Sequence, residues 1–475
     1  MITRIAKKEF LEMWRDGRFR WAALIVVVLL GMALILGGKH YVTTKKEREA
    51  AQNLSRTSWL TQGSRNPHSA AHFGVYAFKP PQPLSLVDKG LEGFTGVSIW
   101  VEAHNQNPPQ YRPAEDATSV GRFGELTGAF VLQLLLPLLI ILLSYNSFAG
   151  ERESGTLVQL LSTGAPMRKL ATGKILGIVC CLAVLLVPAS ILGAVALLLA
   201  SENGWFVWSI PRLLLMSVAY LLYFGALVGV GLTVSALAKS SRKALIVLLA
   251  FWTVNCLLVP RLVSDLAEAK YPSPTTEEFW EAVHKDINQG IDGHDPSNAR
   301  SAKLKQQILE RYGVKDEKDL PINLNGIMLN AGEEYGNTVF DKHYGAVWQN
   351  RFAQEKVHHV SSAIAPFMAV RSLSSAMAGT DLLQYRHFTT AVEQYRRDLN
   401  KFLNQYFAEH SRTSEGYNYF AGKELWDQTP DFTYEPPGTA WVLKQQLLPL
   451  TVLLLWCFGA LSLSVLVANQ TRKLN

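Results

Sequence analysis

Residues 148–175 read FAGERESGTLVQLLSTGAPMRKLATGKI and lie between two long apolar segments of the chain. The stretch is polar, so it is predicted to leave the membrane, and its basic residues favour the cytoplasmic side. Acidic side chains come first, where the dipole of a helix favours them, and leucines then recur at helical spacing before glycine and proline end the pattern. These residues are Glu151 and Glu153, then Leu157, Leu160 and Leu161, and finally Gly164 and Pro166. The stretch therefore predicts a short amphipathic helix, a break and a basic segment that leads into the next apolar run.

A helix of this kind has two interpretations. It can dock into the groove of a partner or lie on lipid, and it can equally be a solvated connector that separates two spans. The sequence ERESGTL at 151–157, followed by LLS at 160–162 and GK at 173–174, resembles the cytoplasmic loop of ABC-2-type transporter permeases. The resemblance implies that this loop is the coupling element that contacts a separate ATPase subunit.

The resemblance assigns ATPase coupling to residues of this loop. They are Glu151, Glu153, Gly155, Thr156, Leu157, Leu160, Leu161, Arg168 and Lys174. Among them, Gly155 is expected to allow close approach of the backbone. Arg168 and Lys174 are alternatively expected to bind lipid phosphate.

The composition disfavours an ordinary soluble enzyme. The chain has 475 residues, of which 48% are hydrophobic and 18% charged, so membrane spans combined with sizeable polar segments fit best. The net charge is +7, and the basic residues cluster beside the apolar runs as orientation signals do, so nucleic acid is not an expected partner. The four cysteines all lie within apolar runs and cannot cross-link a polar segment.

Several apolar runs approach the roughly 20 residues that a helix needs to cross a membrane. The chain is therefore predicted to be an α-helical polytopic membrane protein with six transmembrane helices, a small mixed ectodomain and a larger, mostly helical ectodomain. In order, the predicted segments are a cytoplasmic amphipathic connecting helix at 1–20, the first span at 21–37, a first periplasmic segment at 38–124, the second span at 125–146, the cytoplasmic coupling loop at 147–174, the third span at 175–200, a short outer loop at 201–210, the fourth span at 211–238, a cytoplasmic turn at 239–243, the fifth span at 244–261, a second periplasmic domain at 262–441, the sixth span at 445–468 and a cytoplasmic tail at 469–475. Basic residues occur in every segment assigned to the cytoplasm, which puts both termini there. A signal peptide in place of the first span is disfavoured, because acidic residues interrupt the basic N-terminal region and no small-residue cleavage site follows.

Four phrases further resemble a bacterial subgroup of ABC-2 permeases with large insertions after the first and fifth spans. They are NPHSAAHFG at 66–74, FKPPQPLSLVDKG at 78–90, EAHNQN at 102–107 and MAGTDL at 377–382. The resemblance implies a bacterial inner (cytoplasmic) membrane, with the insertions in the periplasm. The size of these insertions leaves the substrate open.

Capping signals divide the second predicted periplasmic domain into helices. Asp295 is expected to cap a helix that has Pro296 at its first position. Another helix is expected to begin at Thr380 or Asp381 and to carry an apolar stripe along residues 382–406.

Motifs for energy conversion and catalysis are missing from the sequence. The predicted spans are almost free of ionisable residues, which an ion-driven transporter needs for its relay. No phosphate-binding G-x-x-x-x-G-K-[ST] motif occurs, because Arg168 stands where the earlier glycine would be needed before Gly173 and Lys174. Metalloprotease, hydrolase-elbow and deaminase signatures are also missing. The chain is therefore not expected to be an enzyme, and ATP and Mg are expected in a partner ATPase chain.

Four residues form a weak candidate for a metal site. His68 and His72 share one face if their segment is helical, and Glu102 and His104 follow in a later polar phrase. Zinc or copper would suit such ligands. Imidazoles without a defined ligand set usually have hydrogen-bonding or surface roles, so the sequence assigns neither a metal site nor a cofactor to this chain.

Gly225 and Gly229 form a small-xxx-small pattern in the fourth predicted span. This pattern lets another helix approach closely. The approaching helix can belong to the same chain or to a second copy, since both contacts use the same geometry.

The sequence thus predicts the membrane-spanning permease subunit of an ABC transporter, in which a separate ABC ATPase drives substrate movement and export is expected. The expected partners are that ATPase, a second permease chain that is identical or related, and membrane lipid. One alternative is a non-transporting scaffold that transmits ATP-driven motion to a periplasmic partner. Another is a membrane-anchored metal-handling protein, which rests on the histidines alone.

Overall fold

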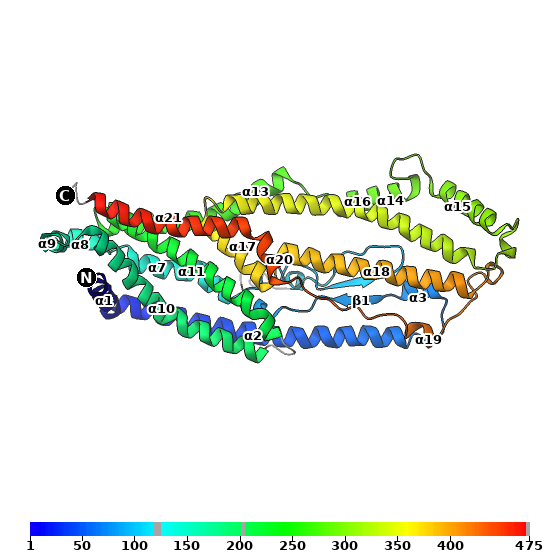
Figure 1. Cartoon of the computed structure of the whole chain (residues 1–475), viewed down its shortest axis with the longest axis horizontal. Coiled ribbons are helices and arrows are strands. Elements are labelled where there is room, and N and C mark those ends of the chain that lie inside the picture. The colour runs from blue at the N-terminus through cyan, green and yellow to red at the C-terminus, as the bar shows by residue number, and fades with distance from the viewer. Residues whose placement is uncertain (117–124, 201–204, 472–475) are drawn as a thin grey trace.

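The computed structural model shows an elongated molecule (Figure 1). It describes residues 1–116, 125–200 and 205–471. Parts of the predicted first periplasmic segment, of the predicted outer loop at 201–210 and of the predicted tail at 469–475 therefore lie outside the described residues.

The molecule has two halves (Figure 1). Apolar helices form the half that carries α1 (Ile2–Arg15) and the last turn of α21 (Leu447–Thr471), and we call this half the bundle and its outer end the terminal end. The other half, which we call the distal domain, is formed mainly by residues 61–116, 271–361 and 382–435.

Within the described residues, six helices are long and apolar enough to cross a membrane. They contain α2 (Gly17–Leu60); α6 (Gly128–Phe130), α7 (Leu136–Ser144) and α8 (Ala149–Glu153); α10 (Met167–Ala200); α11 (Trp205–Leu237); α12 (Ser241–Thr253) and α13 (Val259–Lys270); and α21. Short π-helical segments join pieces of the second and fifth of these, at η2 (Val131–Leu135) and η3 (Val254–Leu258). The N–H and C=O groups of such spans form hydrogen bonds within the helix, because lipid offers them no partners. The chain is thus a multi-pass, mostly α-helical membrane protein.

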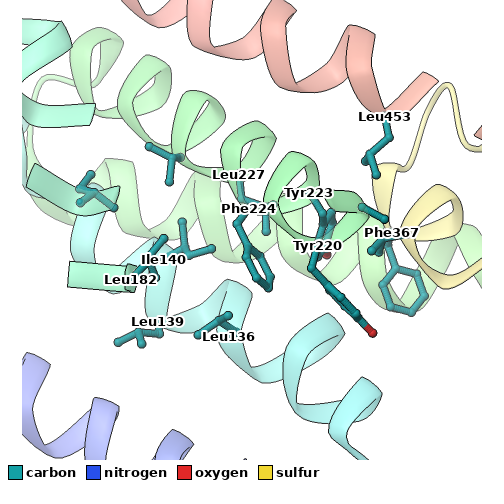
Figure 2. Packing of buried hydrophobic residues seen from close by; sticks show 14 of the residues in the cluster. Leu136, Leu139, Ile140, Leu182, Tyr220, Tyr223, Phe224, Leu227, Phe367 and Leu453 are labelled. Carbon is teal, nitrogen blue, oxygen red and sulfur yellow. The ribbon is translucent and has the colours of Figure 1, made fainter. Parts of the chain in front are cut away.

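The core of the bundle is built around α11. This helix touches α7, α10, α12, α17 (Pro366–Ala378) and α21. Figure 2 shows the apolar side chains of this core, namely Leu136, Leu139 and Ile140 of α7, Leu182 of α10, Tyr220, Tyr223, Phe224 and Leu227 of α11, Phe367 of α17 and Leu453 of α21. A displacement of α11 would therefore disturb the packing of most other spans.

The first span, α2, extends far beyond the bundle. Its 44 residues give a length of about 66 Å, roughly twice the thickness of a hydrocarbon core. Near its middle, a Cβ atom on Gly37 would lie 2.1 Å from the carbonyl oxygen of Leu86, so only glycine permits this contact. At its far end, the buried indole Nε1 of Trp59 donates a hydrogen bond to Thr429 Oγ1 at 2.7 Å. α2 therefore belongs to both halves of the molecule.

The distal domain combines long helices with a two-stranded sheet. α16 (Leu324–Ser361) packs against α18 (Leu382–His410), and α14 (Thr276–Gln289) and α15 (Ser297–Tyr312) pack on α16. β1 (Val75–Phe78) and β2 (Ser98–Val101) pair antiparallel, with Val75 opposite Val101, and α3 (Pro67–Phe73) packs on α18. The shorter elements are η1 (Pro83–Leu86), α4 (Pro113–Asp116), η4 (Glu317–Asp319), η5 (Thr413–Glu415), α19 (Lys423–Trp426) and α20 (Thr439–Gln445).

Several helix boundaries differ from the sequence predictions. The helix of the third span begins at Met167 rather than at residue 175, and the helix of the fifth span continues to Lys270 rather than ending near 261. Both extensions mix charged and polar residues with apolar ones, so a hydropathy criterion for membrane spans leaves them out. α15 has Pro296 at its N-cap rather than Asp295, because Pro296 itself has an extended backbone.

The predicted start of α18 is confirmed. Asp381 is the N-cap, and its carboxylate accepts hydrogen bonds from the backbone N–H and the side-chain amide of Gln384 at 3.3 and 2.7 Å. The predicted apolar stripe of this helix packs in the core of the distal domain. Burial raises the pKa of Asp381 to about 6, although the hydrogen bonds from Gln384 act in the opposite direction.

Candidate functional site

A buried group of charges ties together three elements at the terminal end. Nζ of Lys174, on α10, lies 2.7 Å from Oε1 of Glu9 on α1 and 2.8 Å from Oε1 of Glu151 on α8. Lys174 is only 1% exposed, and Lys8 adds a second cation 3.3 Å from Glu151. We call Lys8, Glu9, Glu151 and Lys174 the Lys174 cluster. Since its ammonium group is enclosed and paired, the expectation that Lys174 binds lipid phosphate is wrong.

The predicted coupling loop, residues 147–174, contains two short helices where the sequence predicted one. α8 ends at Glu153, and α9 (Thr156–Ser162) begins after Gly155, which has a φ of 74°. A Cβ atom at Gly155 would meet nothing within 4 Å. Within this chain, the glycine is therefore needed for its left-handed backbone, and the space beside it is open. The break at Gly164, with a φ of 79°, follows the prediction.

Arg152 and Glu153 fasten this loop to the neighbouring spans. The guanidinium of Arg152 donates to the carbonyl oxygens of Ala238 and Ala236, at 2.5 and 2.9 Å, where α11 ends. The hydroxyl of Ser241, at the start of α12, donates to Glu153 at 2.6 Å. Sequence reasoning did not single out Arg152. Its position inside the loop motif was the available signal, but its carbonyl partners lie more than 80 residues away.

α9 has one inward face and one outward face. Leu157 is 2% exposed and belongs to the core of the bundle, and Leu160 and Leu161 are half-buried against it. Val158 is 62% exposed, and Gln159 beside it is also exposed. Figure 1 places α9 at the extreme terminal end. The exposed surface of this helix is therefore the Val158 side, whereas the leucines pack against the bundle.

The other predicted coupling residues lie at the surface. Glu153, Thr156 and Arg168 are exposed, and the hydroxyl of Thr156 donates to the carbonyl oxygen of Glu151 at 3.3 Å. The structure thus gathers the predicted residues at one end of the bundle but divides them between an internal group, which includes Glu151, Leu157 and Lys174, and an accessible one.

Gly225 and Gly229 of α11 face α21 of the same chain. A Cβ atom on Gly225 would lie 2.6 Å from Sγ of Cys457, and one on Gly229 would lie 2.4 Å from the backbone of Ala460. The close approach that the sequence pattern allows is thus used within this chain.

The distal domain brings three distant imidazoles together. His68 and His72 lie one turn apart on α3, and His104 lies in the loop after β2. One ring nitrogen from each lies within 4.8 Å of the others, and the ring centroids are 4.8 to 5.0 Å apart. Glu102, the fourth predicted residue, is not part of this group; its carboxylate accepts a hydrogen bond from Asn107 at 2.9 Å. We call His68, His72 and His104 the histidine triad.

A buried carboxylate supports the histidine triad from α16. Oε1 of Glu333 accepts from the backbone N–H of His104 at 2.7 Å and lies 2.8 Å from its Nδ1. Oε2 of Glu333 lies 3.2 Å from the guanidinium of Arg396 on α18. Burial raises the pKa of Glu333, but the hydrogen bonds from His104 and the charge of Arg396 outweigh burial, so the pKa lies below its ordinary value. Sequence reasoning missed Glu333 and Arg396, since no local pattern marks them.

Burial also lowers the pKa of two imidazoles of the triad, those of His68 and His72. Burial and, to a smaller extent, the neighbouring imidazoles of His104 and His72 together lower the pKa of His68 to about 4. Burial and His104 lower the pKa of His72 as well. These two imidazoles are therefore neutral near pH 7.

The comparison with protein families finds a match in the distal domain. A family model described as a domain of unknown function, DUF3526, matches residues 276–435, from the first residue of α14 to the segment before α20. The match includes Glu333 and Arg396 but neither the coupling loop nor the histidine triad. No curated protein matches the chain.

Proposed function

We propose that this chain is the membrane-spanning permease subunit of an ABC transporter. A separate ATPase subunit, which holds ATP and Mg, docks on the terminal end and drives substrate movement, most simply export. The observation that carries this proposal is the arrangement of α8 and α9: the outward face of α9 is exposed at the tip of the bundle, and α8, directly before it in the chain, is joined to α1 and α10 through the Lys174 cluster.

The contacts of the loop suggest how a partner's motion would spread. A push on α9 would reach α8, to which the hydroxyl of Thr156 is hydrogen-bonded, and then α10 and α1, because the ammonium group of Lys174 pairs with both Glu151 of α8 and Glu9 of α1. The same push would reach α11 through Arg152, which holds the carbonyl oxygens at the end of that helix. Since α11 touches most other spans, motion at the loop would reorganise the whole bundle.

In this proposal the terminal end faces the cytoplasm of a bacterial cell, and the distal domain lies in the periplasm. Basic residues support this orientation, since they occur on α1, at the start of α10 and in the turn before α12. A second permease chain, identical or related, completes the pathway at an interface between the two bundles.

The test uses the ATPase encoded beside this chain. Both are co-expressed, and co-purification and ATP hydrolysis are measured for the wild type and for Val158→Asp, which puts a charge on the outward face of α9. Leu54→Asp is the matched control, because Leu54 is a similarly exposed apolar residue on the distal part of α2. We expect Val158→Asp to release the ATPase or to uncouple hydrolysis, and Leu54→Asp to behave as the wild type. Full binding and coupling in the Val158 variant would contradict the docking of an ATPase at α9.

A second candidate function is a scaffold that transmits ATP-driven motion without transport. The size of the distal domain favours it, because this domain has its own core, built on Trp59, Trp426 and Phe388. A structure of the assembled complex separates the two functions. A continuous polar path between the permease chains supports transport, and a sealed apolar interface supports the scaffold.

A further inference from the structure

We propose that His68, His72 and His104 form a binding site for a divalent transition-metal ion of the zinc class, with three imidazole ligands and an open fourth position. The site lies in the distal domain, far from the coupling loop (Figure 1). It goes beyond the proposed transport function and does not depend on it.

The spacing of the nitrogens suits such an ion. Nε2 of His68 lies 3.2 Å from Nε2 of His72. Two nitrogens bound tetrahedrally to zinc, each at 2.0–2.1 Å, are separated by about 3.3 Å. All three ligand nitrogens lie within 4.8 Å of one another, so binding requires the exposed rings of His72 and His104 to rotate toward the ion.

Glu333 prepares His104 for this role. A carboxylate can only accept hydrogen bonds, so the distance of 2.8 Å between Oε1 of Glu333 and Nδ1 of His104 requires a proton on Nδ1. In the neutral imidazole the lone pair is then on Nε2, where it is available to a metal. This is the carboxylate–histidine arrangement that orients ligands in many zinc sites.

Contacts of the backbone fix the triad before any ion arrives. The side chain of Asn66 caps α3 by accepting from the backbone N–H of His68 at 2.9 Å. The backbone N–H of Ala103 donates to the carbonyl oxygen of Ala71 at 3.1 Å, which holds the His104 loop against α3. His104 itself has a φ of 67°, a backbone conformation that histidine rarely adopts. The structure therefore maintains an unusual loop that directs this imidazole toward the other two.

The donor set indicates the class of ion. Three imidazoles suit zinc, copper and nickel, whereas magnesium and calcium prefer oxygen ligands. His68 is buried and the other two histidines are exposed, so the fourth position opens toward solvent. Such a site can exchange its ion and can accept a water molecule or another small ligand.

The first test measures metal binding to the full chain in detergent. The protein is stripped with a chelator, incubated with Zn²⁺, desalted and analysed for bound metal, with Mg²⁺ as the negative control. We expect one Zn²⁺ per chain in the wild type and at least a 100-fold loss of affinity in a His72→Ala, His104→Ala double variant. Both side chains are exposed, so this variant is expected to fold, and its melting temperature without metal checks that it does. A His284→Ala, His294→Ala variant is the matched control, because it removes two exposed imidazoles from the same domain.

The second test examines Glu333 as a positioning residue. Glu333→Gln keeps the size of the side chain and leaves Arg396 paired with Glu393 at 2.8 Å. We expect a 10- to 100-fold weaker Zn²⁺ affinity, as is typical when such a carboxylate is lost. Tetrahedral Co²⁺ gives a strong visible spectrum, and we expect this spectrum in the wild type and its loss in the double variant.

Two results would overturn the proposal. One is a folded wild-type chain that retains no Zn²⁺, which would make the triad a hydrogen-bonded group. The other is equal binding by the wild type and the His72, His104 double variant, which would place the metal elsewhere in the chain.

Discussion

Replacement of Lys174 by methionine tests whether the Lys174 cluster holds the terminal end together. Methionine has a similar length but no charge, so two carboxylates, Glu9 and Glu151, would face each other across the space left by the ammonium group. Each of their Oε1 atoms lies within 2.8 Å of Nζ, so the two charges are about 5 Å apart, and at an effective dielectric constant of about 20 they repel by about 3 kcal/mol. This value agrees with the roughly 3–5 kcal/mol that is lost when one partner of a buried ion pair is removed.

The assay is the unfolding of the purified chain in detergent, followed by tryptophan fluorescence. We expect Lys174→Met to lower the free energy of unfolding by about 3 kcal/mol, although the half-exposed Lys8 offsets a part of the repulsion. Lys169→Met, an exposed position on the same helix, is the control and should change stability by no more than about 0.5 kcal/mol.

A triple variant separates charge from packing. Lys174→Met combined with Glu9→Gln and Glu151→Gln removes all three charges and should recover most of the lost stability, because a whole buried charge group can be replaced at little net cost. Two results would refute this account of the cluster. One is a decrease of less than about 1 kcal/mol in the free energy of unfolding of Lys174→Met, and the other is a triple variant that is no more stable than Lys174→Met.

Three further changes test other contacts. Gly229→Ala should lower the melting temperature of the chain, because the new Cβ would lie 2.4 Å from the backbone of Ala460. The control is Gly459→Ala on the facing helix, where a Cβ meets nothing within 4 Å, so this variant should be neutral or stabilising. Equal changes in melting temperature for the two variants would disprove the packing argument. Arg152→Ala should lower the free energy of unfolding by about 1–3 kcal/mol, since it removes the donors to two carbonyl oxygens. Amide hydrogen exchange at the end of α11 should become faster in this variant, and an unchanged exchange rate there would contradict the argument. The pKa of Asp381 is raised from 3.8 to about 6 in the fold, so the wild type loses stability as pH rises between these values. Asp381→Asn has no carboxyl group at this position and so does not lose stability in this way. The difference in melting temperature between the variant and the wild type should therefore shift in favour of the variant as pH rises from about 4 to about 6. A difference that stays constant over this range would contradict the raised pKa.

The sequence predicts those parts of the fold that follow from one local rule. Lipid requires long apolar helices whose backbone bonds are internal, so hydropathy alone locates the six apolar helices. Capping chemistry is equally local, which is why Asp381 was predicted correctly as a possible start of α18. The split between α8 and α9 was missed because glycine is compatible with several backbone conformations, and only the structure gives Gly155 its positive φ.

The sites depend on contacts between distant residues, which a single sequence does not display. Lys174 looks like a surface cation until Glu9, 165 residues earlier, is placed beside it. His104 approaches His68 and His72 only because the loop after β2 is held on α3 and on Glu333, which lies 229 residues away. The i, i+4 spacing of His68 and His72 was the part of the triad that could be read locally.

The contact at Gly37 divides α2 into two arms of nearly equal length. About 30 Å of helix lies between Gly17 and Gly37, and about 35 Å lies between Gly37 and Leu60. A stiff rod supported near its middle rotates about that support, and its two ends then travel in opposite directions by similar distances. A rotation of about 5° about Leu86 would swing each end by about 3 Å, which is as long as one hydrogen bond. If α2 turned as a stiff rod about this contact, a displacement of α1 at the terminal end would be linked to one of the indole of Trp59 in the distal domain.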